Sequence, residues 1–245
     1  MKPAMDKLVA GGVAVLVAGL LVLGVLGLDR PVHAAAAAMV DVPAPGGMAD
    51  LRQPGVRHAR VVFAGGCFWG VQGVFQHVKG VESAVAGYIG GSAADARYVR
   101  VGTGRTGHAE AVQVTYDPAQ VGYAQLMQVF FSVVHDPTQL DRQGPDRGSQ
   151  YRSVVYADDA PQRAATLAYI DQLQRSGVFA APVVTRVEGG RRFYPAEDYH
   201  QNYLALHPDA PYIRINDLPK VEALKRQYPA LYRDKPRLIA TLSVR

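Results

Sequence analysis

The sequence predicts an α+β fold, and three observations support this prediction. Short apolar runs typical of strands alternate along the chain with segments whose apolar residues recur at helical spacing. Of the 245 residues, 49% are hydrophobic and 19% are charged, a balance that indicates a globular protein and excludes a disordered, collagen-like or coiled-coil chain. The chain is also long enough to bury a core without disulfides or metal ions.

The first elements are expected directly after residue 60. A pair of glycines ends a short apolar strand over 61–64. A helix then begins at Cys67, because apolar residues recur at helical spacing as far as Val78, and Gly80 ends it. A second strand over 81–88 follows, so the domain opens with a strand, a helix and a strand.

The rest of the chain continues this alternation. A glycine-rich loop leads to a strand over 109–116, in which apolar side chains alternate. A helix over 123–134 and a polar loop over 135–150 come next. We then expect, in order, a strand over 151–156, a helix over 161–175, a strand over 181–187, an aromatic-rich segment over 193–206 and a helix over 218–228. Four or five strands with helices between them would build one layered α+β domain.

The N-terminus has the pattern of an export signal. Lys2 and Lys7 precede an uncharged apolar run over 8–28, and small residues around Ala34 form an A-x-A-like cleavage site. Residues 1–34 are therefore expected to be a signal peptide. The alternative is an uncleaved anchor, because a run of this length can cross a bilayer core of roughly 30 Å. Either way, we expect an exported protein that lies in the periplasm or otherwise outside the cytoplasm.

Two regions follow the expected signal. Residues 35–59 combine alanines with scattered prolines and glycines and show no sustained apolar period, so we expect a flexible tether. The folded domain is expected over 60–245. Its last part, the tail over 208–245, contains no cysteine.

Charge and cysteine content exclude several kinds of site. The formal net charge is +5, but the basic residues are dispersed and form no run of five, which argues against nucleic acid as a partner. Cys67 is the single cysteine of the chain. An internal disulfide is therefore impossible, and a zinc site of several thiolates is excluded. We expect no metal site.

Cys67 is the first candidate catalytic residue. A lone cysteine is most often a buried small hydrophobe, and this interpretation stays open. Two features favour a nucleophile. Cys67 follows two glycines in the first turn of the expected helix, where unpaired backbone N–H groups and the helix dipole stabilise a thiolate. An exported protein also exposes an unpaired thiol to oxidants, so the residue is either well buried or chemically required.

Glu110 is the second candidate. It has the same parity along its strand as Val112 and Val114, which places its carboxyl on the apolar face. Burial there would raise the pKa of the carboxyl and make it a proton donor near neutral pH. Two alternatives stay open: the strand begins after Glu110, or an ion pair satisfies the carboxylate.

Aromatic residues are frequent near these candidates. Phe68 and Trp69 stand beside the thiol, where either could wall an apolar pocket, although Phe68 fits the core-facing stripe of the helix better. Most tyrosines are packing residues, so residue type alone does not select among those in the loops. These are Tyr88, Tyr98, Tyr151, Tyr194, Tyr199 and Tyr203.

The segment Gly66-Cys67-Phe68-Trp69-Gly70 resembles the active-site signature of the A-type peptide methionine sulfoxide reductases. The match extends from about Val61 to Leu206, and several signatures in register make it specific. The further signatures, in the order that the family shows, are Gly87-Tyr88-Ile89-Gly90-Gly91, Arg105-Thr106-Gly107-His108-Ala109-Glu110, Tyr116-Asp117-Pro118, His135-Asp136-Pro137-Thr138, Arg142-Gln143-Gly144, Gln150-Tyr151-Arg152-Ser153 and Ala196-Glu197-Asp198-Tyr199-His200-Gln201.

The resemblance implies thiol-dependent reduction of the S epimer of methionine sulfoxide, free or in proteins, and so repair of oxidised proteins. Cys67 then matches the nucleophile that becomes a sulfenic acid, and Glu110 matches the acid that protonates the sulfoxide oxygen. This set suits the chemistry, because sulfoxide sulfur accepts a nucleophile only when its oxygen is neutralised. The other matches are hydroxyls that hold the oxygen, Tyr98 and Tyr151, the pocket for the substrate methyl group, Phe68 and Trp69, and polar residues around the site, Asp146 and Tyr203.

The resemblance also implies a two-layer α/β sandwich with a ferredoxin-like core. The cysteine-free tail departs from many relatives, which carry further cysteines there that attack the sulfenic acid and pass electrons to thioredoxin. An external thiol, either a thioredoxin-like protein or a small molecule, must therefore reduce this protein. We expect a monomer with no bound cofactor.

Two other functions stay open. A cysteine hydrolase or acyltransferase would pair Cys67 with His135 or His200 and an acid, although nothing in the sequence indicates that either histidine reaches the thiol. A non-catalytic exported domain would bind a partner through Trp69 and the loop tyrosines.

Overall fold

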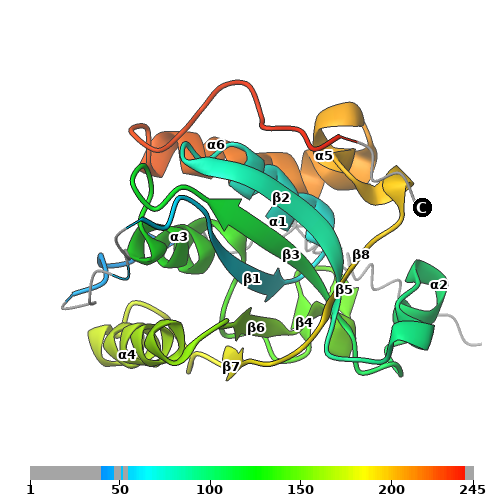
Figure 1. Cartoon of the computed structure of the whole chain (residues 1–245), viewed down its shortest axis with the longest axis horizontal. Coiled ribbons are helices and arrows are strands. Elements are labelled where there is room, and N and C mark those ends of the chain that lie inside the picture. The colour runs from blue at the N-terminus through cyan, green and yellow to red at the C-terminus, as the bar shows by residue number, and fades with distance from the viewer. Residues whose placement is uncertain (1–39, 47–50, 52–54, 241–245) are drawn as a thin grey trace, which may run out of the picture. The chain divides into compact units, whose positions relative to one another are not determined.

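The centre of the computed structural model, which describes residues 40–46, 51 and 55–240, is a six-stranded sheet (Figure 1). Its strands are β1 (Ala59–Gly65), β2 (Val81–Ile89), β3 (Ala109–Tyr116), β6 (Ser153–Tyr156), β7 (Arg186–Glu188) and β8 (Phe193–Pro195). Their order across the sheet is β7-β6-β1-β3-β2-β8. Neighbouring strands are antiparallel except for β6 and β7, which are parallel.

Helices and a small hairpin complete the described fold. The hairpin consists of β4 (Arg142–Gln143) and β5 (Asp146–Arg147). The α-helices are α1 (Phe68–Gln76), α2 (Tyr98–Val101), α3 (Tyr123–Val129), α4 (Ala160–Ser176), α5 (Tyr203–Leu206) and α6 (Leu218–Gln227). The shorter helical turns are η1 (Ala93–Asp95), η2 (Phe130–Val134), η3 (Ser149–Tyr151), η4 (Asp198–His200) and η5 (Ile213–Asp217).

The main core lies between the sheet and helices α1, α3, α4 and α6. Phe63 of β1 stacks on Phe75 of α1 and on Phe130 of η2, with ring centroids 4.9 and 4.7 Å apart. Alternate residues of β3, such as Val112, face this core, whereas Ala111 belongs to a smaller cluster on the other face of the sheet. The period of two that the sequence shows therefore determines which side chains of β3 point to the helices.

The α+β class predicted from the sequence is confirmed. Helix α1 connects β1 to β2, and α3 with η2 lies between β3 and β6, so the four central strands follow a β-α-β-β-α-β order. Strands β7 and β8 extend the sheet at its two edges. The finer description of the core as ferredoxin-like stays a prediction.

Three details differ from the expected elements. The sheet has six strands rather than four or five, because the aromatic-rich segment expected over 193–206 contributes the short edge strand β8. The strand expected over 151–156 begins two residues later, and Tyr151 lies on η3 instead. The strand expected over 181–187 is reduced to β7, because the N–H of Val184 donates to the carbonyl of Pro137, 2.8 Å away in a loop, rather than to a neighbouring strand.

Part of the expected tether packs on the domain. Val42 is only 2% exposed and belongs to the main core. The Tyr169 hydroxyl of α4 donates to the carbonyl oxygen of Pro43 at 2.8 Å. Residues 40–46 are therefore held against the domain by burial and hydrogen bonds, which differs from the flexible tether expected over 35–59.

The predicted signal peptide, residues 1–34, lies outside the described residues. Within the part of the chain that the structure describes, no helix is both long and apolar enough to cross a bilayer. The domain boundary predicted at residue 60 falls next to the start of β1 at Ala59.

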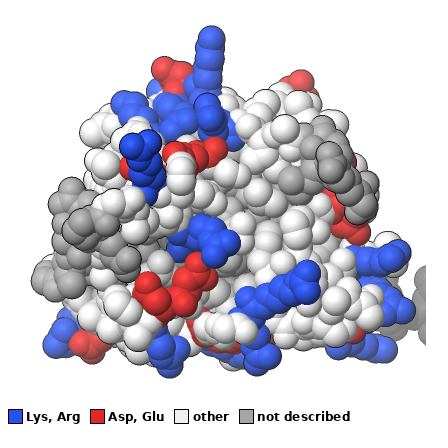
Figure 2. Space-filling model, viewed as in Figure 1, with Lys and Arg blue, Asp and Glu red and all other residues white. Residues whose placement is uncertain are grey.

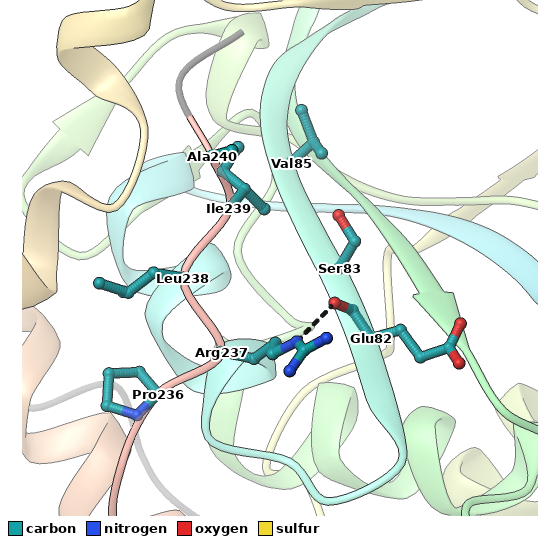
Figure 3. A pocket seen from close by; sticks show the side chains of 8 residues that line it. All are labelled: Glu82, Ser83, Val85, Pro236, Arg237, Leu238, Ile239 and Ala240. Carbon is teal, nitrogen blue, oxygen red and sulfur yellow. Dashed lines mark hydrogen bonds between the residues drawn. The ribbon is translucent and has the colours of Figure 1, made fainter.

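A groove of about 620 Å³ lies between β2 and residues 236–240 (Figure 3). Arg237 runs across this groove and donates its Nε–H to the carbonyl oxygen of Glu82 at 3.4 Å. None of the lining residues belongs to the predicted site around Cys67. Positive and negative side chains are interspersed on the face shown in Figure 2, as the dispersed charges of the sequence predict.

Substituting Val42→Ala tests whether residues 40–46 contribute to the stability of the domain. The two methyl groups that are lost from a buried site should lower the free energy of unfolding by about 1.6 kcal/mol, at about 0.8 kcal/mol per group. Urea denaturation measures this change. The matched control is Val56→Ala, at a residue that is 40% exposed, which should change stability by less than about 0.5 kcal/mol. Equal effects of the two substitutions would contradict the docking of this segment.

Candidate active site

Cys67 stands at the junction between β1 and α1. Gly66 makes the turn with a φ of +96°, and a Cβ added there would lie 2.7 Å from the side chain of Gln143, so only glycine fits. The turn leaves Cys67 as the N-cap residue of α1. Its side chain is 9% exposed and borders the main core. The structure therefore places the thiol at the start of a helix, as the sequence predicts.

Glu110 of β3 reaches the same helix end. It is 2% exposed, and its Oε2 accepts a hydrogen bond from the backbone N–H of Phe68 at 3.0 Å. Burial raises the pKa of the Glu110 carboxyl to about 8, and the carboxyls of Asp146 and Asp217 contribute to this rise. The bond from Phe68 acts in the opposite direction but does not offset burial. Glu110 is therefore a protonated acid at neutral pH.

The thiol itself is protonated in this environment. Burial raises the pKa of Cys67 well above its ordinary value, and the carboxyls of Glu110 and Asp217 raise it further. The backbone N–H of Trp69 lowers it, but by less than burial raises it. The helix end therefore favours the thiolate, as the sequence predicts, but burial and the nearby carboxyls outweigh this effect and keep the thiol protonated.

Two of the predicted tyrosines approach this pair from different elements. Tyr98 begins α2 and Tyr151 ends η3. Burial is the main cause that raises the pKa of each hydroxyl, and the charge of Glu110 is the second largest cause. Cys67 is also among the groups that raise both pKa values. The two phenols therefore lie near the thiol and the acid, and both remain proton donors at neutral pH.

Phe68 and Trp69 have different exposures beside the thiol. Phe68 is fully buried, with its ring 5.8 Å from that of Tyr88. Trp69 is half-buried and stacks on the predicted site residue Tyr203, with ring centroids 3.9 Å apart and an interplanar angle of 11°. The Trp69 and Tyr203 rings therefore form an aromatic wall that is partly open to solvent, whereas Phe68 belongs to the main core.

Asp146 reaches the site from β5 and is held by a residue that the sequence did not single out. The Tyr212 hydroxyl donates to the carboxylate of Asp146. Burial raises the pKa of Asp146, whereas this bond and the charge of Lys220 lower it. Tyr212 also contacts Trp69 edge to face at 5.9 Å. The tail over 208–245 thus contributes an aromatic hydroxyl to the site.

Four further residues lie around the site, and of these only His200 was given a role from the sequence, as a possible partner of Cys67 in a hydrolase. Glu197 accepts from the backbone N–H of Tyr98 at 3.0 Å and so holds α2, and His200 accepts from the indole N–H of Trp69 at 3.2 Å. The other two are Asp217 and Lys220, which form a buried ion pair. A signal for this pair existed, because both stand among the apolar residues of one helical stripe: Ile213, Asp217, Lys220, Val221 and Leu224.

The two histidines of the hydrolase hypothesis are engaged elsewhere. His135 forms hydrogen bonds through Nδ1 with the backbone carbonyl of Phe130 and through Nε2 with the hydroxyl of Ser153. His200 is bonded to Trp69. Neither is hydrogen-bonded to Cys67 in the described part of the chain, so no cysteine–histidine pair forms there. The same residues also contain no group of three acidic, histidine or cysteine side chains suited to a metal ion.

A family model for peptide methionine sulfoxide reductases matches residues 59–231. The chain belongs to this family. The peptide methionine sulfoxide reductase MsrA 2 of Mesorhizobium japonicum is 58% identical over 196 residues, which cover 80% of this chain and 100% of that relative. The MsrA of Chromobacterium violaceum is 45% identical over 172 residues, 70% of this chain and 97% of that relative. The A type expected from the sequence is confirmed.

Solved structures of methionine sulfoxide reductases share the fold. The reduced form of Mxr1 from Saccharomyces cerevisiae matches with a TM-score of 0.60 and 28% identity, over 67% of this chain and 94% of that one. Methionine sulfoxide reductase A of Corynebacterium diphtheriae matches with a TM-score of 0.52 and 34% identity, over 69% of this chain and 84% of that one. As a member of the peptide methionine sulfoxide reductase family, the protein is an oxidoreductase that reduces methionine-S-sulfoxide with thiols and repairs oxidised proteins.

Proposed function

We propose that Cys67 is the nucleophile and Glu110 the proton donor in the reduction of methionine-S-sulfoxide. The observation that carries this proposal is the buried Glu110 carboxyl, whose pKa of about 8 keeps its proton in place at neutral pH. The N–H of Phe68, the residue after Cys67, holds this carboxyl at 3.0 Å. A neutral acid at this position can protonate the sulfoxide oxygen as the thiol sulfur attacks.

The reaction balances with these groups. The sulfur of Cys67 attacks the sulfoxide sulfur while Glu110 gives its proton to the sulfoxide oxygen, and the thiol proton returns to Glu110. The substrate S–O bond breaks and an S–O bond forms on Cys67, which leaves methionine and a sulfenic acid. The substrate sulfur gains two electrons and the Cys67 sulfur loses two.

The other predicted residues surround this reaction. The hydroxyls of Tyr98 and Tyr151 donate to the sulfoxide oxygen and stabilise the charge that develops there. The aromatic wall formed by Trp69 and Tyr203, together with Phe68, binds the methyl group of the substrate by apolar contact. Asp146, oriented by Tyr212, completes the polar rim.

An external thiol completes the cycle. Cys67 is the single cysteine of the sequence, so its sulfenic acid cannot form an internal disulfide. A first external thiol displaces water and forms a mixed disulfide with Cys67. A second thiol then releases Cys67 and forms the external disulfide. A thioredoxin-like dithiol protein suits this sequence best, because it supplies both thiols from one molecule.

The substitution Glu110→Gln tests the acid. The amide keeps the size of the side chain but cannot give up a proton in the same way, so reduction in a single turnover should slow by roughly 100-fold or more. Quenching the reaction at successive times and quantifying the methionine formed measures this rate. Glu222→Gln, at an exposed residue of α6, is the matched control and should react at the wild-type rate. A wild-type rate in folded Glu110→Gln would remove Glu110 from the mechanism.

The single cysteine predicts the yield of one turnover. With methionine-S-sulfoxide and no reductant, the protein should form one methionine per chain, because the sulfenic acid on Cys67 has no partner thiol. The intact mass should increase by one oxygen, and dimedone should trap that species. Cys67→Ser should form no methionine. A yield near two would contradict this cycle, since it would need a second reducing group within the chain.

We also propose that the protein is exported to the periplasm or an equivalent compartment through its N-terminal segment. The charged start, the uncharged apolar run and the small residues around Ala34 support this location. Protein purified from an exporting host should begin near Ala35 on N-terminal sequencing. A chain that begins at Met1 and sediments with membranes would instead indicate the uncleaved anchor, and a chain that stays in the cytoplasm would exclude both.

A further inference from the structure

A buried ion pair lies behind the first turn of α1, outside the groups that the proposed mechanism uses. The Nζ of Lys220 is 3.1 Å from Oδ1 of Asp217, and the two side chains are 7% and 0% exposed. Asp217 ends η5 and Lys220 lies in the first turn of α6. Because removing charges from water costs free energy, a pair this deeply buried is weak evidence of added stability and invites a functional explanation.

Gly70 leaves open the space that this pair occupies. A Cβ added at Gly70 would lie 2.1 Å from Oδ1 of Asp217 and 2.9 Å from Nζ of Lys220. Gly70 is three residues after Cys67, so the pair contacts the helical turn that carries the thiol. Any larger residue at position 70 would displace the carboxylate. Glycine is therefore required at position 70, because only a residue without a Cβ leaves room for a buried charge next to the turn of the thiol.

The Asp217 carboxylate is only partly neutralised by its partner. Its Oδ2 is buried and has no hydrogen-bond partner among the residues that the structure describes. Burial raises the pKa of the Asp217 carboxyl, whereas the charge of Lys220 and its hydrogen bond at 3.1 Å lower this pKa and favour the ionised form. A Cβ atom built at Gly70 would also lie closer to the Asp217 carboxylate than to the Lys220 ammonium. The nearer charge behind this turn is therefore the negative one.

Two other carboxyls and three phenols also lie near the thiol. Glu110 on β3 is protonated at neutral pH, although its ionised form raises the pKa of the thiol more than Asp217 does. Asp146 on β5 accepts a hydrogen bond from Tyr212. The phenols around the thiol are neutral, because burial raises their pKa values: Tyr98, Tyr151 and Tyr212. Asp217 is thus the buried carboxylate with a free oxygen next to the turn of Cys67, and it is among the groups that raise the pKa of the thiol.

We propose that Asp217 is a positioning residue: paired with Lys220 in the space left by Gly70, its carboxylate keeps the Cys67 thiol protonated while no substrate is bound. The proposal rests on Cys67 as the reactive thiol. A protonated thiol reacts poorly with peroxide, because the thiolate is the nucleophile. The single cysteine of an exported enzyme would in this way be spared from oxidants that do not enter the site. Burial alone also protects it, so the charge must be tested separately.

The test measures the reactivity of Cys67 without any sulfoxide, which separates it from the proposed reduction. Iodoacetamide alkylates the thiolate, and intact mass reports one adduct because the chain has one cysteine. In Asp217→Asn the pH profile of alkylation should move to lower pH, and the rate near neutral pH should rise about tenfold for each unit of that movement. Oxidation by hydrogen peroxide should accelerate in parallel.

Two further variants keep this test decisive. Asp217→Asn leaves Lys220 buried without a partner and can unfold the protein, so Asp217→Asn/Lys220→Met removes both charges. The double variant should also move the profile to lower pH, by less than the single one. The control is Asp171→Asn, which breaks the exposed pair of Asp171 with Arg175 on α4 and should leave the profile unchanged. An unchanged profile, or one moved to higher pH, in either folded variant would overturn the proposal.

Discussion

The hydrogen bond from the Phe68 N–H to the Glu110 carboxyl is the interaction on which the rest of the site depends. It joins β3 to the first turn of α1 over 3.0 Å inside the core. The first N–H groups of a helix have no partner within the helix, and leaving one unpaired in the core would be costly. Glu110 satisfies this group, and burial in turn keeps the proton on Glu110. The same contact therefore stabilises the helix end and holds the acid beside Cys67.

Helix α1 also holds the C-terminal half of the site through buried amides. Gln72 donates to Gln201 at 2.9 Å and accepts from the backbone N–H of Asn202 at 2.8 Å. Gln76 donates to the side chain of Asn202 at 2.7 Å. These bonds hold the segment that leads into α5 and Tyr203. Since α1 begins with the thiol and carries Trp69, one helix of nine residues positions groups that are far apart in the chain.

Local features of the site follow from pattern, and electrostatic features do not. The parity of β3 predicted Glu110 on the buried face but left two alternatives open, and the glycine pair with the apolar period predicted Cys67 at a helix start. The helix end lowers the pKa of the thiol, as the sequence predicts, but burial and remote carboxyls raise this pKa by more. The helix dipole is a local property of α1, whereas the opposing carboxyls come from β3, β5 and η5. The position of Tyr151 on a turn, rather than in a strand, likewise depends on non-local pairing.

The sequence by itself determined the α+β class, the order of most elements, the family and the absence of a second thiol, because these depend on periodicity, motif order and composition. Only the tertiary structure decided that residues 40–46 join the domain, that Tyr212 holds Asp146, and that Asp217 with Lys220 fills the space beside Gly70. The physical reason is that Coulomb and desolvation energies depend on distance and burial. Those two quantities exist only once segments remote in the chain have packed together.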